Sequence, residues 1–275
     1  MNNLNDIKNL ILDMDGVLWH GETAVPGLAD FFATLRRREI GFILATNNAT
    51  KTVDQYTAKL ARFGVIIPPA QILTSSLVTA AYLSQQYPPD TAVYVIGERG
   101  LREALKAQGL RLLGRQDGEN GERAAAVVIG LDRTAQYDDL AAATWYICQQ
   151  QAQFVATNPD PSLPTERGPM PGAGALVAAV QAATGVKPVI IGKPGPRLFE
   201  EALRLLAGSK TNTAMVGDRL TTDIAGAQAV GLRGILLLSG VTSLVDAAVN
   251  QIKADWVFDD LQALTAALNE GESSK

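Results

Sequence analysis

LILDMDGVLWHGE, residues 10–22, joins an apolar run to two aspartates that stand one residue apart, Asp13 and Asp15. A short, continuous apolar run of this kind is typical of a buried strand in a parallel sheet. Gly16 follows at once and gives the backbone the freedom to turn sharply. The chain therefore places two carboxylates where its core should continue, which indicates a site with a chemical purpose.

The segments around this strand alternate between strand-like and helix-like patterns. Short apolar runs alternate with amphipathic segments of helix length near both ends of the chain, and the helical patterns near the C-terminus close in glycine. Such alternation predicts βαβ units and an α/β fold with a Rossmann-like, doubly wound parallel sheet. We expect one sheet from NLIL at 9–12, GFILA at 41–45, PVIIG at 188–192, TAMVG at 213–217 and GILLLSG at 234–240.

The middle of the chain carries further strand candidates, AVYVI at 92–96, AAAVVI at 124–129 and FVA at 154–156, with helical segments between them. This apolar material is enough for a small sheet of its own, so we expect a second, smaller α/β domain inserted into the first. The predicted division assigns residues 1–78 plus 187–275 to the core domain and residues 79–186 to the insert. GRQDGENGE at 114–122 predicts an exposed loop or hairpin tip.

Composition and charge narrow the functional classes. The 275 residues are 47% hydrophobic and carry a net charge of -4, with a pI near 5.1, so the chain lacks the diffuse basic surface that binding to a nucleic-acid polymer needs. No apolar run approaches the ~20 residues of a membrane span, and the N-terminus does not resemble a signal peptide. The single cysteine, Cys148, excludes an intrachain disulfide, and we expect it to be buried in a helix. These features predict a cytoplasmic protein that binds no membrane.

Polar residues follow four of the predicted strands directly: Asp13, Thr46, Lys193 and Asp218. In an open parallel sheet, ligands bind beyond the carboxyl ends of the strands, because loops and helix N-termini converge there. Carboxylates, a hydroxyl and an ammonium should therefore meet at one edge. Mg²⁺ prefers few protein ligands together with water and substrate phosphate oxygens, so this combination predicts a Mg²⁺ site that handles a phosphate.

The two aspartates after the first strand suit the two tasks of phosphoryl transfer. Asp13 can attack phosphorus to give an aspartyl phosphate, with Mg²⁺ reducing the repulsion between the anions. Asp15 can lie on the same side of the extended chain, and it can protonate the departing oxygen and later deprotonate water.

The other polar residues supply binding groups. Thr46 and Asn47 offer a hydroxyl and N–H donors where a helix begins, which favours anions. Lys193 provides a fixed positive charge, and Asp218 completes the metal site. Asp223 lies at a helix start and can orient metal-bound water or Lys193.

Four stretches resemble the motifs of the haloacid dehalogenase superfamily, in the same order and context: DMDGVL at 13–18, ATNN at 45–48, GKPGP at 192–196 and VGDRLTTDI at 216–224. The resemblance spans nearly the whole chain. Within the superfamily, the sequence looks like the NagD-like, p-nitrophenylphosphatase-type group (subfamily IIA). The insert resembles the α/β cap of that group, through VVIGLDRTAQYDDL at 127–140, ATNPD at 156–160 and PMPGAGALVAAV at 169–180.

The resemblance implies a role for each candidate. It makes Asp13 the nucleophile and a Mg²⁺ ligand, and it makes Asp15 the general acid and base, whose main-chain carbonyl also binds the metal. The remaining implied roles are phosphate binding by Thr46 and Lys193, metal binding by Asp218 and Asp223, and a position near the substrate for Asn47 and for the cap loop 157–160 with Asn158. The cap residues that select the substrate vary within the family, so the resemblance does not identify them.

Simpler interpretations apply to several of these residues. An EF-hand loop would need a third oxygen ligand before Gly16 and a glutamate at its twelfth position, and the sequence has neither. Asp218 and Asp223 taken alone would be ordinary helix caps. Residues 158–160, Asn-Pro-Asp, suit a turn as well as a substrate-facing loop. His20 is the sole histidine, which argues against a histidine triad or a zinc cluster.

The sequence therefore predicts a Mg²⁺-dependent phosphatase that hydrolyses a small-molecule phosphomonoester through an aspartyl phosphate. Two alternatives stay open: a phosphotransferase or phosphomutase of the same fold, and a non-catalytic protein that binds a phosphorylated metabolite. The substrate class is equally open among nucleotides, sugar phosphates, phosphoglycolate and pyridoxal phosphate. A homodimer is compatible with the resemblance, although no feature of the sequence measures an interface.

Overall fold

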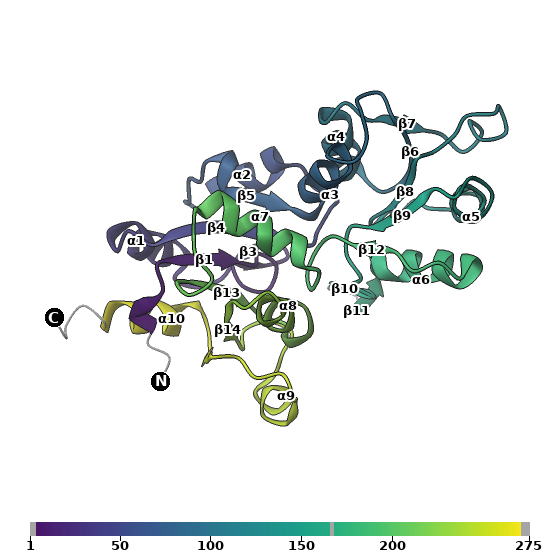
Figure 1. Ribbon diagram of the computed structural model, residues 1–275. Coiled ribbons are helices and arrows are strands. Elements are labelled where there is room, and N and C mark those ends of the chain that lie inside the picture. Colours follow the sequence, from purple (N-terminus) through teal and green to yellow (C-terminus); the bar gives the residue numbers. More distant parts are fainter. Residues whose placement is uncertain (1–3, 166–167, 271–275) are drawn as a thin grey trace. The chain divides into compact units, whose positions relative to one another are not determined.

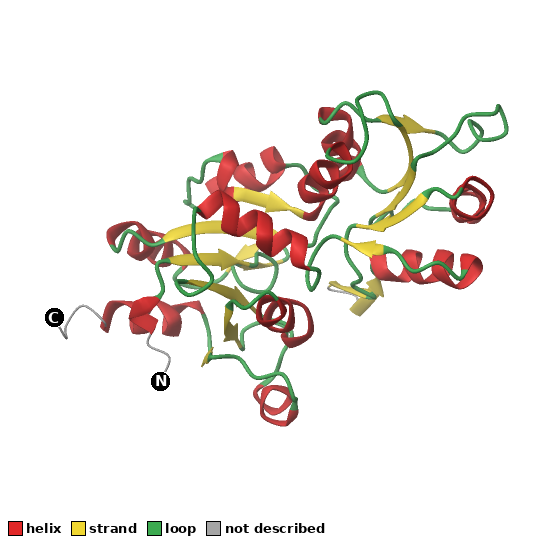
Figure 2. Cartoon of the chain, in the orientation of Figure 1, coloured by secondary structure: helices red, strands yellow, loops and turns green. Residues whose placement is uncertain are grey.

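The computed structural model describes residues 4–165 and 168–270, which form two compact units (Figure 1). The first unit contains the residues up to Thr46, Tyr56–Leu73 and the residues from Lys193 onward; the second contains Asn47–Gln55 and Thr74–Gly192. In both units, helices flank the strands (Figure 2). The division into a core domain and an inserted cap at residues 79 and 187 stays a prediction.

The sheet of the first unit combines strands from both ends of the chain. Its order is β15 (Trp256–Phe258), β14 (Arg233–Leu237), β13 (Thr213–Gly217), β1 (Asn9–Leu12), β4 (Gly41–Thr46) and β5 (Ile72–Thr74). The strand β1 pairs in parallel with β13 on one side and with β4 on the other. Since β1 is buried on both faces, it needs the continuous apolar run that the sequence shows. The predicted α/β class and parallel sheet are confirmed.

The helical elements of the first unit are η1 (Leu4–Asp6), α1 (Leu28–Arg37), η2 (Pro69–Gln71), α7 (Pro196–Leu206), α8 (Ala225–Ala229), α9 (Leu244–Val249) and α10 (Leu261–Glu270). The helix α2 (Val53–Arg62) begins in the second unit and continues into the first. A single π-helical turn, η3 (Leu220–Ile224), precedes α8. A short hairpin of β2 (Trp19–His20) and β3 (Thr23–Ala24) follows β1.

The second unit has a parallel sheet in the order β12 (Val189–Ile190), β9 (Gln153–Ala156), β8 (Ala126–Ile129), β6 (Ala92–Ile96) and β7 (Arg111–Leu113). Its helices are α3 (Ser75–Ser84), α4 (Arg99–Ala107), α5 (Tyr137–Gln150) and α6 (Ala173–Thr184). The core forms where the apolar faces of α5 and α6 pack on β6, β8 and β9. An antiparallel hairpin of β10 (Ser162–Thr165) and β11 (Gly168–Pro171) precedes α6.

Two sequence predictions about packing are wrong. PVIIG was expected in the first sheet, but its strand β12 pairs with β9 in the sheet of the second unit. An apolar run indicates a buried parallel strand, but it does not determine which strand it pairs with. Cys148 was expected to be buried, but it is exposed, because the buried face of α5 runs through Ala143, Tyr146 and Ile147 instead.

The loop at 114–122 consists of turns and is mostly exposed, as predicted. No helix within the described residues has the length and apolar character needed to cross a membrane.

Candidate active site

Three carboxylates of the first unit meet beyond the ends of two neighbouring strands. Asp13 directly follows β1, Asp218 directly follows β13, and Asp223 lies in the π-helical turn η3. Leu12 pairs with Val216 across the two parallel strands, so the chains leave the sheet side by side. One carboxylate oxygen from each aspartate lies within 4.8 Å of the others, and all three residues are buried. The structure thus joins the beginning and the end of the chain in one acidic cluster.

Lys193 supplies the positive charge of this cluster. Its ammonium Nζ lies 2.6 Å from Asp13 Oδ1 and 2.8 Å from Asp223 Oδ1, and it donates to the main-chain oxygen of Ala45 at 3.3 Å. Burial alone would lower the pKa of the Lys193 ammonium, but attraction to Asp13 and Asp223 outweighs burial and raises that pKa above its ordinary value. Lys193 is therefore a buried, permanent cation between two carboxylates.

The cluster nevertheless has more negative than positive charge, with three carboxylates against one ammonium. Burial raises the pKa of Asp13 well above its usual value, and Asp223 and Asp218 add to the shift while Lys193 opposes it. Burial and the Asp223 charge raise the pKa of Asp218 to about 6. Like charges held together in a dry site disfavour their own ionisation, which a bound cation would offset.

Asp218 is the carboxylate best placed to receive such a cation. Its Oδ2 accepts from the N–H of Val241 at 2.8 Å, but no hydrogen-bond partner within the described parts of the chain reaches its buried Oδ1. A Cβ on Gly16 or Gly240 would collide with this carboxylate, so both glycines are needed for the close approach of the backbone. Asp223, in contrast, has both oxygens engaged, Oδ1 by Lys193 and Oδ2 by the N–H of Arg219 at 3.0 Å. An oxygen-only donor set with one unsatisfied buried oxygen fits a hard divalent cation.

Asp15 stands apart from the three clustered carboxylates. Its side chain is exposed, and its Oδ1 accepts from the indole Nε1 of Trp19 at 2.7 Å. The chain between them forms a closed turn, in which Gly16 has a φ of 89° and its N–H donates to the main-chain oxygen of Trp19 at 2.8 Å. The predicted role of the Asp15 main-chain carbonyl as a metal ligand stays a prediction.

Thr46 ends β4, the other neighbour of β1, and is buried. The buried Tyr56 lies near the charges of Asp15 and Asp13, which act on its hydroxyl. Burial is the largest cause of the raised pKa of Tyr56, followed by the charge of Asp15. The first unit therefore brings Asp13, Asp15, Thr46, Lys193 and both remaining aspartates to one edge of its sheet.

Asn47 and Asn158, the other predicted substrate-binding residues, lie together in the second unit. Asn158 Nδ2 donates to the main-chain oxygen of Asn47 at 2.8 Å, and its Oδ1 accepts from the N–H of Asp160 at 3.1 Å. Asn47 Nδ2 donates in turn to Asp160 Oδ2 at 3.1 Å. Both ends of the Asn158 amide are thus engaged in holding the loop, and a contact of this residue with substrate stays a prediction.

Sequence reasoning missed Trp19, Tyr56 and Lys59, which pack together behind Asp15. The Trp19 ring stacks on Tyr56 with centroids 6.3 Å apart, and Lys59 Nζ lies 4.4 Å from the Trp19 ring centroid. A tryptophan after a turn and an aromatic residue on an amphipathic helix are ordinary core residues in a sequence. Only the closed turn reveals that the indole N–H points at Asp15.

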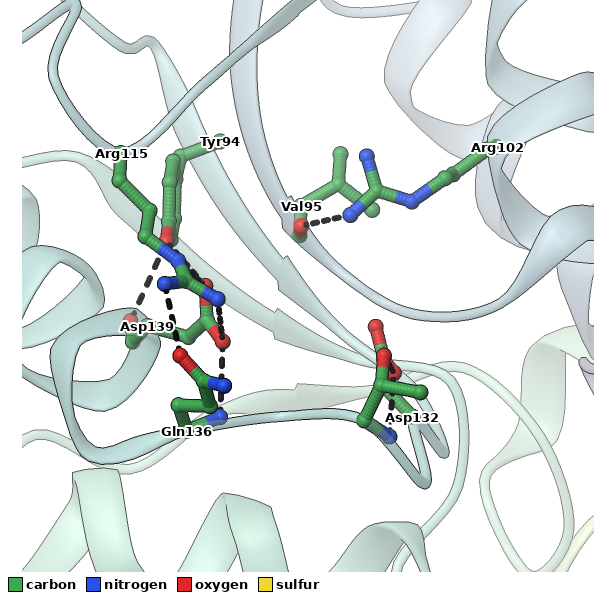
Figure 3. A network of polar contacts seen from close by, with 8 residues as sticks. Tyr94, Val95, Arg102, Arg115, Asp132, Gln136 and Asp139 are labelled. Carbon is green, nitrogen blue, oxygen red and sulfur yellow. Dashed lines mark hydrogen bonds and ion pairs between the residues drawn. The ribbon is translucent and has the colours of Figure 1, made fainter.

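The second unit contains a polar network of a different kind (Figure 3). Arg115 donates from Nε and Nη2 to the two oxygens of the Asp139 carboxylate, and from Nη1 to Gln136 Oε1 at 3.0 Å. The N–H of Gln136 also donates to Asp139 Oδ2, at 2.8 Å, and completes a capping box at the start of α5. Burial would raise the pKa of Asp139, but these hydrogen bonds outweigh it and lower that pKa. The network is a helix cap tied to the 114–122 loop, with its charges paired.

The family follows from comparison with known proteins. Residues 10–111 match the family model described as haloacid dehalogenase-like hydrolase, and residues 190–264 match the one described as HAD-hydrolase-like. An acid sugar phosphatase of Staphylococcus epidermidis is 38% identical over 260 residues, which cover 94% of this chain and 97% of that protein. The chain belongs to the haloacid dehalogenase-like hydrolases.

Similarity to solved structures agrees with this family assignment. The 4-nitrophenylphosphatase of Thermotoga maritima has a TM-score of 0.88 at 32% identity, with 96% of this chain and 98% of that chain covered. The glycerol phosphate phosphatase of Mycobacterium tuberculosis in complex with magnesium has a TM-score of 0.85 at 35% identity, covering 95% of this chain and 77% of that one. Within the haloacid dehalogenase-like hydrolases, the predicted membership of the NagD-like, p-nitrophenylphosphatase-type group is therefore confirmed.

Proposed function

We propose that this haloacid dehalogenase-like hydrolase is a Mg²⁺-dependent phosphatase that hydrolyses small phosphomonoesters through an aspartyl phosphate on Asp13. One observation carries the proposal. Asp13, Asp218 and Asp223 converge in a buried cluster that contains one cation, Lys193, and an unsatisfied oxygen on Asp218. Such a cluster has the composition that a Mg²⁺ ion and a phosphate group together require.

The carboxylates of Asp13 and Asp218 would hold the ion, with Asp223 and the main-chain carbonyl of Asp15 completing the site. When bound, Mg²⁺ neutralises charge on Asp13 and on the phosphoryl oxygens, which lets two anions approach each other. Asp223 also holds Lys193, because its Oδ1 lies 2.8 Å from Nζ. This pairing keeps the ammonium at the cluster, where it can bind a phosphoryl oxygen.

In the first half of the reaction, an oxygen of Asp13 attacks phosphorus while the bond from phosphorus to the ester oxygen breaks. Asp15 gives its proton to that departing oxygen, so the alcohol leaves neutral. The products of this step are the free alcohol, the aspartyl phosphate and ionised Asp15. Thr46, at the end of the neighbouring strand, can donate its hydroxyl proton to a phosphoryl oxygen.

In the second half, ionised Asp15 takes a proton from a water molecule as the water oxygen attacks phosphorus. The bond between phosphorus and the Asp13 oxygen breaks, which releases inorganic phosphate and restores both aspartates to their starting states. One carboxylate therefore serves as acid and then as base in successive steps. Its exposed position on a turn gives water and the departing alcohol access to it.

Relatives support phosphorylated sugars and polyols as the substrate class, since they include an acid sugar phosphatase and a glycerol phosphate phosphatase. A small substrate that is free in the cytoplasm agrees with the prediction, made from composition, of a cytoplasmic protein that binds no nucleic-acid polymer and no membrane. We accordingly place sugar phosphates and glycerol phosphates ahead of nucleotides, phosphoglycolate and pyridoxal phosphate.

Release of inorganic phosphate from a panel of these esters, with excess Mg²⁺ and with a chelator, tests the proposal. We expect multiple turnovers with Mg²⁺, none with chelator, and recovery when Mg²⁺ is added back. Binding of phosphate esters without turnover would instead identify a non-catalytic sensor. Transfer of phosphate to an added alcohol, with little free phosphate, would identify a phosphotransferase.

A further inference from the structure

Asp15 needs a fixed orientation that its own position does not provide. Its side chain is exposed on a turn, where a carboxylate has freedom to rotate. A general acid must lie within hydrogen-bond reach of the oxygen that it protonates, so rotation would reduce its efficiency. Trp19 binds both the carboxylate and the turn: its Nε1 donates to Asp15 Oδ1 at 2.7 Å, and its main-chain oxygen accepts from Gly16 at 2.8 Å.

Several other side chains pack against Trp19 itself. It is fully buried, it stacks on Tyr56 with an interplanar angle of 21°, and its ring centroid lies 6.1 Å from that of Phe63. Tyr56 and Lys59 stand three residues apart on α2, so one face of this helix contacts the indole. Close packing allows a buried ring of this size few alternative positions. The contacts with α2 therefore restrict the direction of the indole N–H independently of its bond to Asp15.

Lys59 adds an electrostatic contribution. Its side chain is 4% exposed, its Nζ lies 4.4 Å from the Trp19 ring centroid, and it donates to the main-chain oxygen of Gly21 at 2.5 Å. A cation over the face of an indole is attracted by the ring electrons, and it draws electron density away from the N–H. That polarisation strengthens the N–H as a donor toward the carboxylate of Asp15.

We propose that Trp19 is a positioning residue that holds the Asp15 carboxylate in the orientation required for proton transfer to and from the substrate. This role rests on the proposed function of Asp15 as general acid and base. The indole N–H is a donor only, so Oδ1 must be the acceptor in the acid and in the base form alike. The proton that Asp15 delivers is consequently carried on Oδ2, the oxygen that Trp19 does not bind.

A comparison of substrates with different leaving groups distinguishes the positioning role of Trp19 from a purely structural role. A p-nitrophenolate anion is stable, so its departure needs little help from an acid. An alkoxide from a sugar or from glycerol is a strong base and must receive the Asp15 proton as its bond to phosphorus breaks. Loss of Asp15 orientation should therefore harm alkyl esters more than p-nitrophenyl phosphate, whereas general damage to the fold should harm both equally.

The test compares Trp19→Phe with the unchanged enzyme on glycerol phosphate and on p-nitrophenyl phosphate, both with saturating Mg²⁺. For glycerol phosphate, kcat/KM should fall roughly 10- to 100-fold, a part of the ~10²–10⁴-fold that general acid catalysis contributes. For p-nitrophenyl phosphate, kcat/KM should fall less than about threefold. The ratio kcat/KM reports only the steps up to release of p-nitrophenolate, and that release needs little help from an acid.

Rapid mixing gives a second readout. Hydrolysis of the aspartyl phosphate also needs Asp15, as a base, so this step should become rate-limiting in Trp19→Phe. We expect a burst of p-nitrophenolate that approaches one equivalent per enzyme, followed by slow turnover. A loss of packing alone would not produce a burst that the unchanged enzyme lacks.

Two further variants keep the test decisive. Site-specific replacement of Trp19 by 3-benzothienylalanine exchanges the N–H for sulfur and keeps the bicyclic shape, so it answers the question even where Trp19→Phe does not fold. Phe63→Leu is the packing control, since the Phe63 ring also packs near the Trp19 ring. We expect the benzothienyl variant to match Trp19→Phe, and Phe63→Leu to leave the ratio of the two kcat/KM values within about twofold of the unchanged enzyme.

The outcomes distinguish this inference from the proposed function. Asp13→Asn that retains turnover would overturn the proposed function, and the role of Trp19 with it. Asp15→Asn with a strong preference for p-nitrophenyl phosphate, alongside Trp19 variants that lower both substrates equally, would overturn the role of Trp19 alone. A leaving-group preference and a burst in the Trp19 variants, absent from Phe63→Leu, would support it.

Discussion

Asp218 in the first unit is a buried carboxylate and Asp139 in the second is a partly exposed one, and their hydrogen-bond donors and neighbouring charges differ as well. Asp139 receives Arg115 on both oxygens and a second donor, the N–H of Gln136, on one of them. Asp218 receives one backbone N–H on Oδ2, has no hydrogen-bond partner on Oδ1 within the described residues, and lies beside two other carboxylates. The pKa of Asp139 is lowered and that of Asp218 is raised to about 6.

The difference teaches how to separate a structural charge from a functional one. A carboxylate whose acceptors are filled by protein donors contributes to the fold and has little left for a ligand. A buried carboxylate left without its donors destabilises the metal-free protein, and it persists where a ligand supplies the missing charge. Burial already differs, since Asp218 is 1% exposed and the Asp139 side chain 16%, but the balance of donors and charges shows which carboxylate has a vacant acceptor.

The largest expected effect comes from Asp13→Asn, which removes the proposed nucleophile while keeping the shape of the side chain. We expect kcat/KM with a sugar phosphate and with p-nitrophenyl phosphate to fall by about 10⁴-fold or more, as for other covalent nucleophiles. Phosphate release under saturating Mg²⁺ measures the loss, and the thermal unfolding curve checks that the variant is folded. A folded variant with more than a tenth of the original activity would contradict the role of Asp13.

Asp218→Asn should remove the response of stability to Mg²⁺. Ligand binding to the native state stabilises it by mass action, about 2.7 kcal/mol at a concentration 100 times Kd, so Tm of the unchanged protein should rise by several degrees with excess Mg²⁺. In the variant this rise should nearly vanish. In chelator, its Tm should equal or exceed that of the unchanged protein, because the substitution removes a buried like charge. A full Mg²⁺ response in Asp218→Asn would show that this carboxylate is not a ligand.

Much of the first unit was predictable because local patterns and one topological rule carry the information. The run NLIL indicates a buried strand, and the convergence of strand ends explains why Asp13, Thr46 and Asp218 gather at one edge. The partner of PVIIG was not predictable, since every buried strand in a parallel sheet has a similar apolar run. The local sequence determines whether a segment forms a strand, whereas the order of the strands in a sheet depends on the whole chain.

The position of Cys148 could have been predicted by a closer count. Ala143, Tyr146 and Ile147 are spaced three and four residues apart and form the buried stripe of α5, so Cys148 falls beside the stripe and is exposed. The contact between Trp19 and Asp15 is different, because it depends on a turn closed through Gly16 and on a helix more than thirty residues away. No spacing rule connects an indole to a carboxylate across such a turn.

Asp139→Asn makes the same chemical change as Asp218→Asn, but in the paired network. It removes the charge that Arg115 binds and weakens the cap of α5, so we expect Tm to fall by about 2–4 °C with and without Mg²⁺. The Mg²⁺-induced rise in Tm should keep its full size, and kcat/KM should stay within about twofold of the unchanged enzyme. Equal Mg²⁺ responses in Asp139→Asn and Asp218→Asn would remove the distinction between the two clusters.

The smallest expected effect is a pH dependence of the difference in Tm between the unchanged protein and Asp139→Asn. Hydrogen bonds lower the pKa of Asp139 in the native state, so the native state binds fewer protons there than the unfolded chain, whose carboxyl has a pKa of about 3.9. The contribution of Asp139 to stability is therefore fully present above that value and is lost as pH falls through the native pKa. Thermal unfolding of the unchanged protein and Asp139→Asn should give a constant difference in Tm between pH 7 and about 5, and a shrinking one below about 4. A difference that grows as the solution becomes more acidic would mean that Asp139 is stabilised in its protonated form, which would reverse the contrast with Asp218.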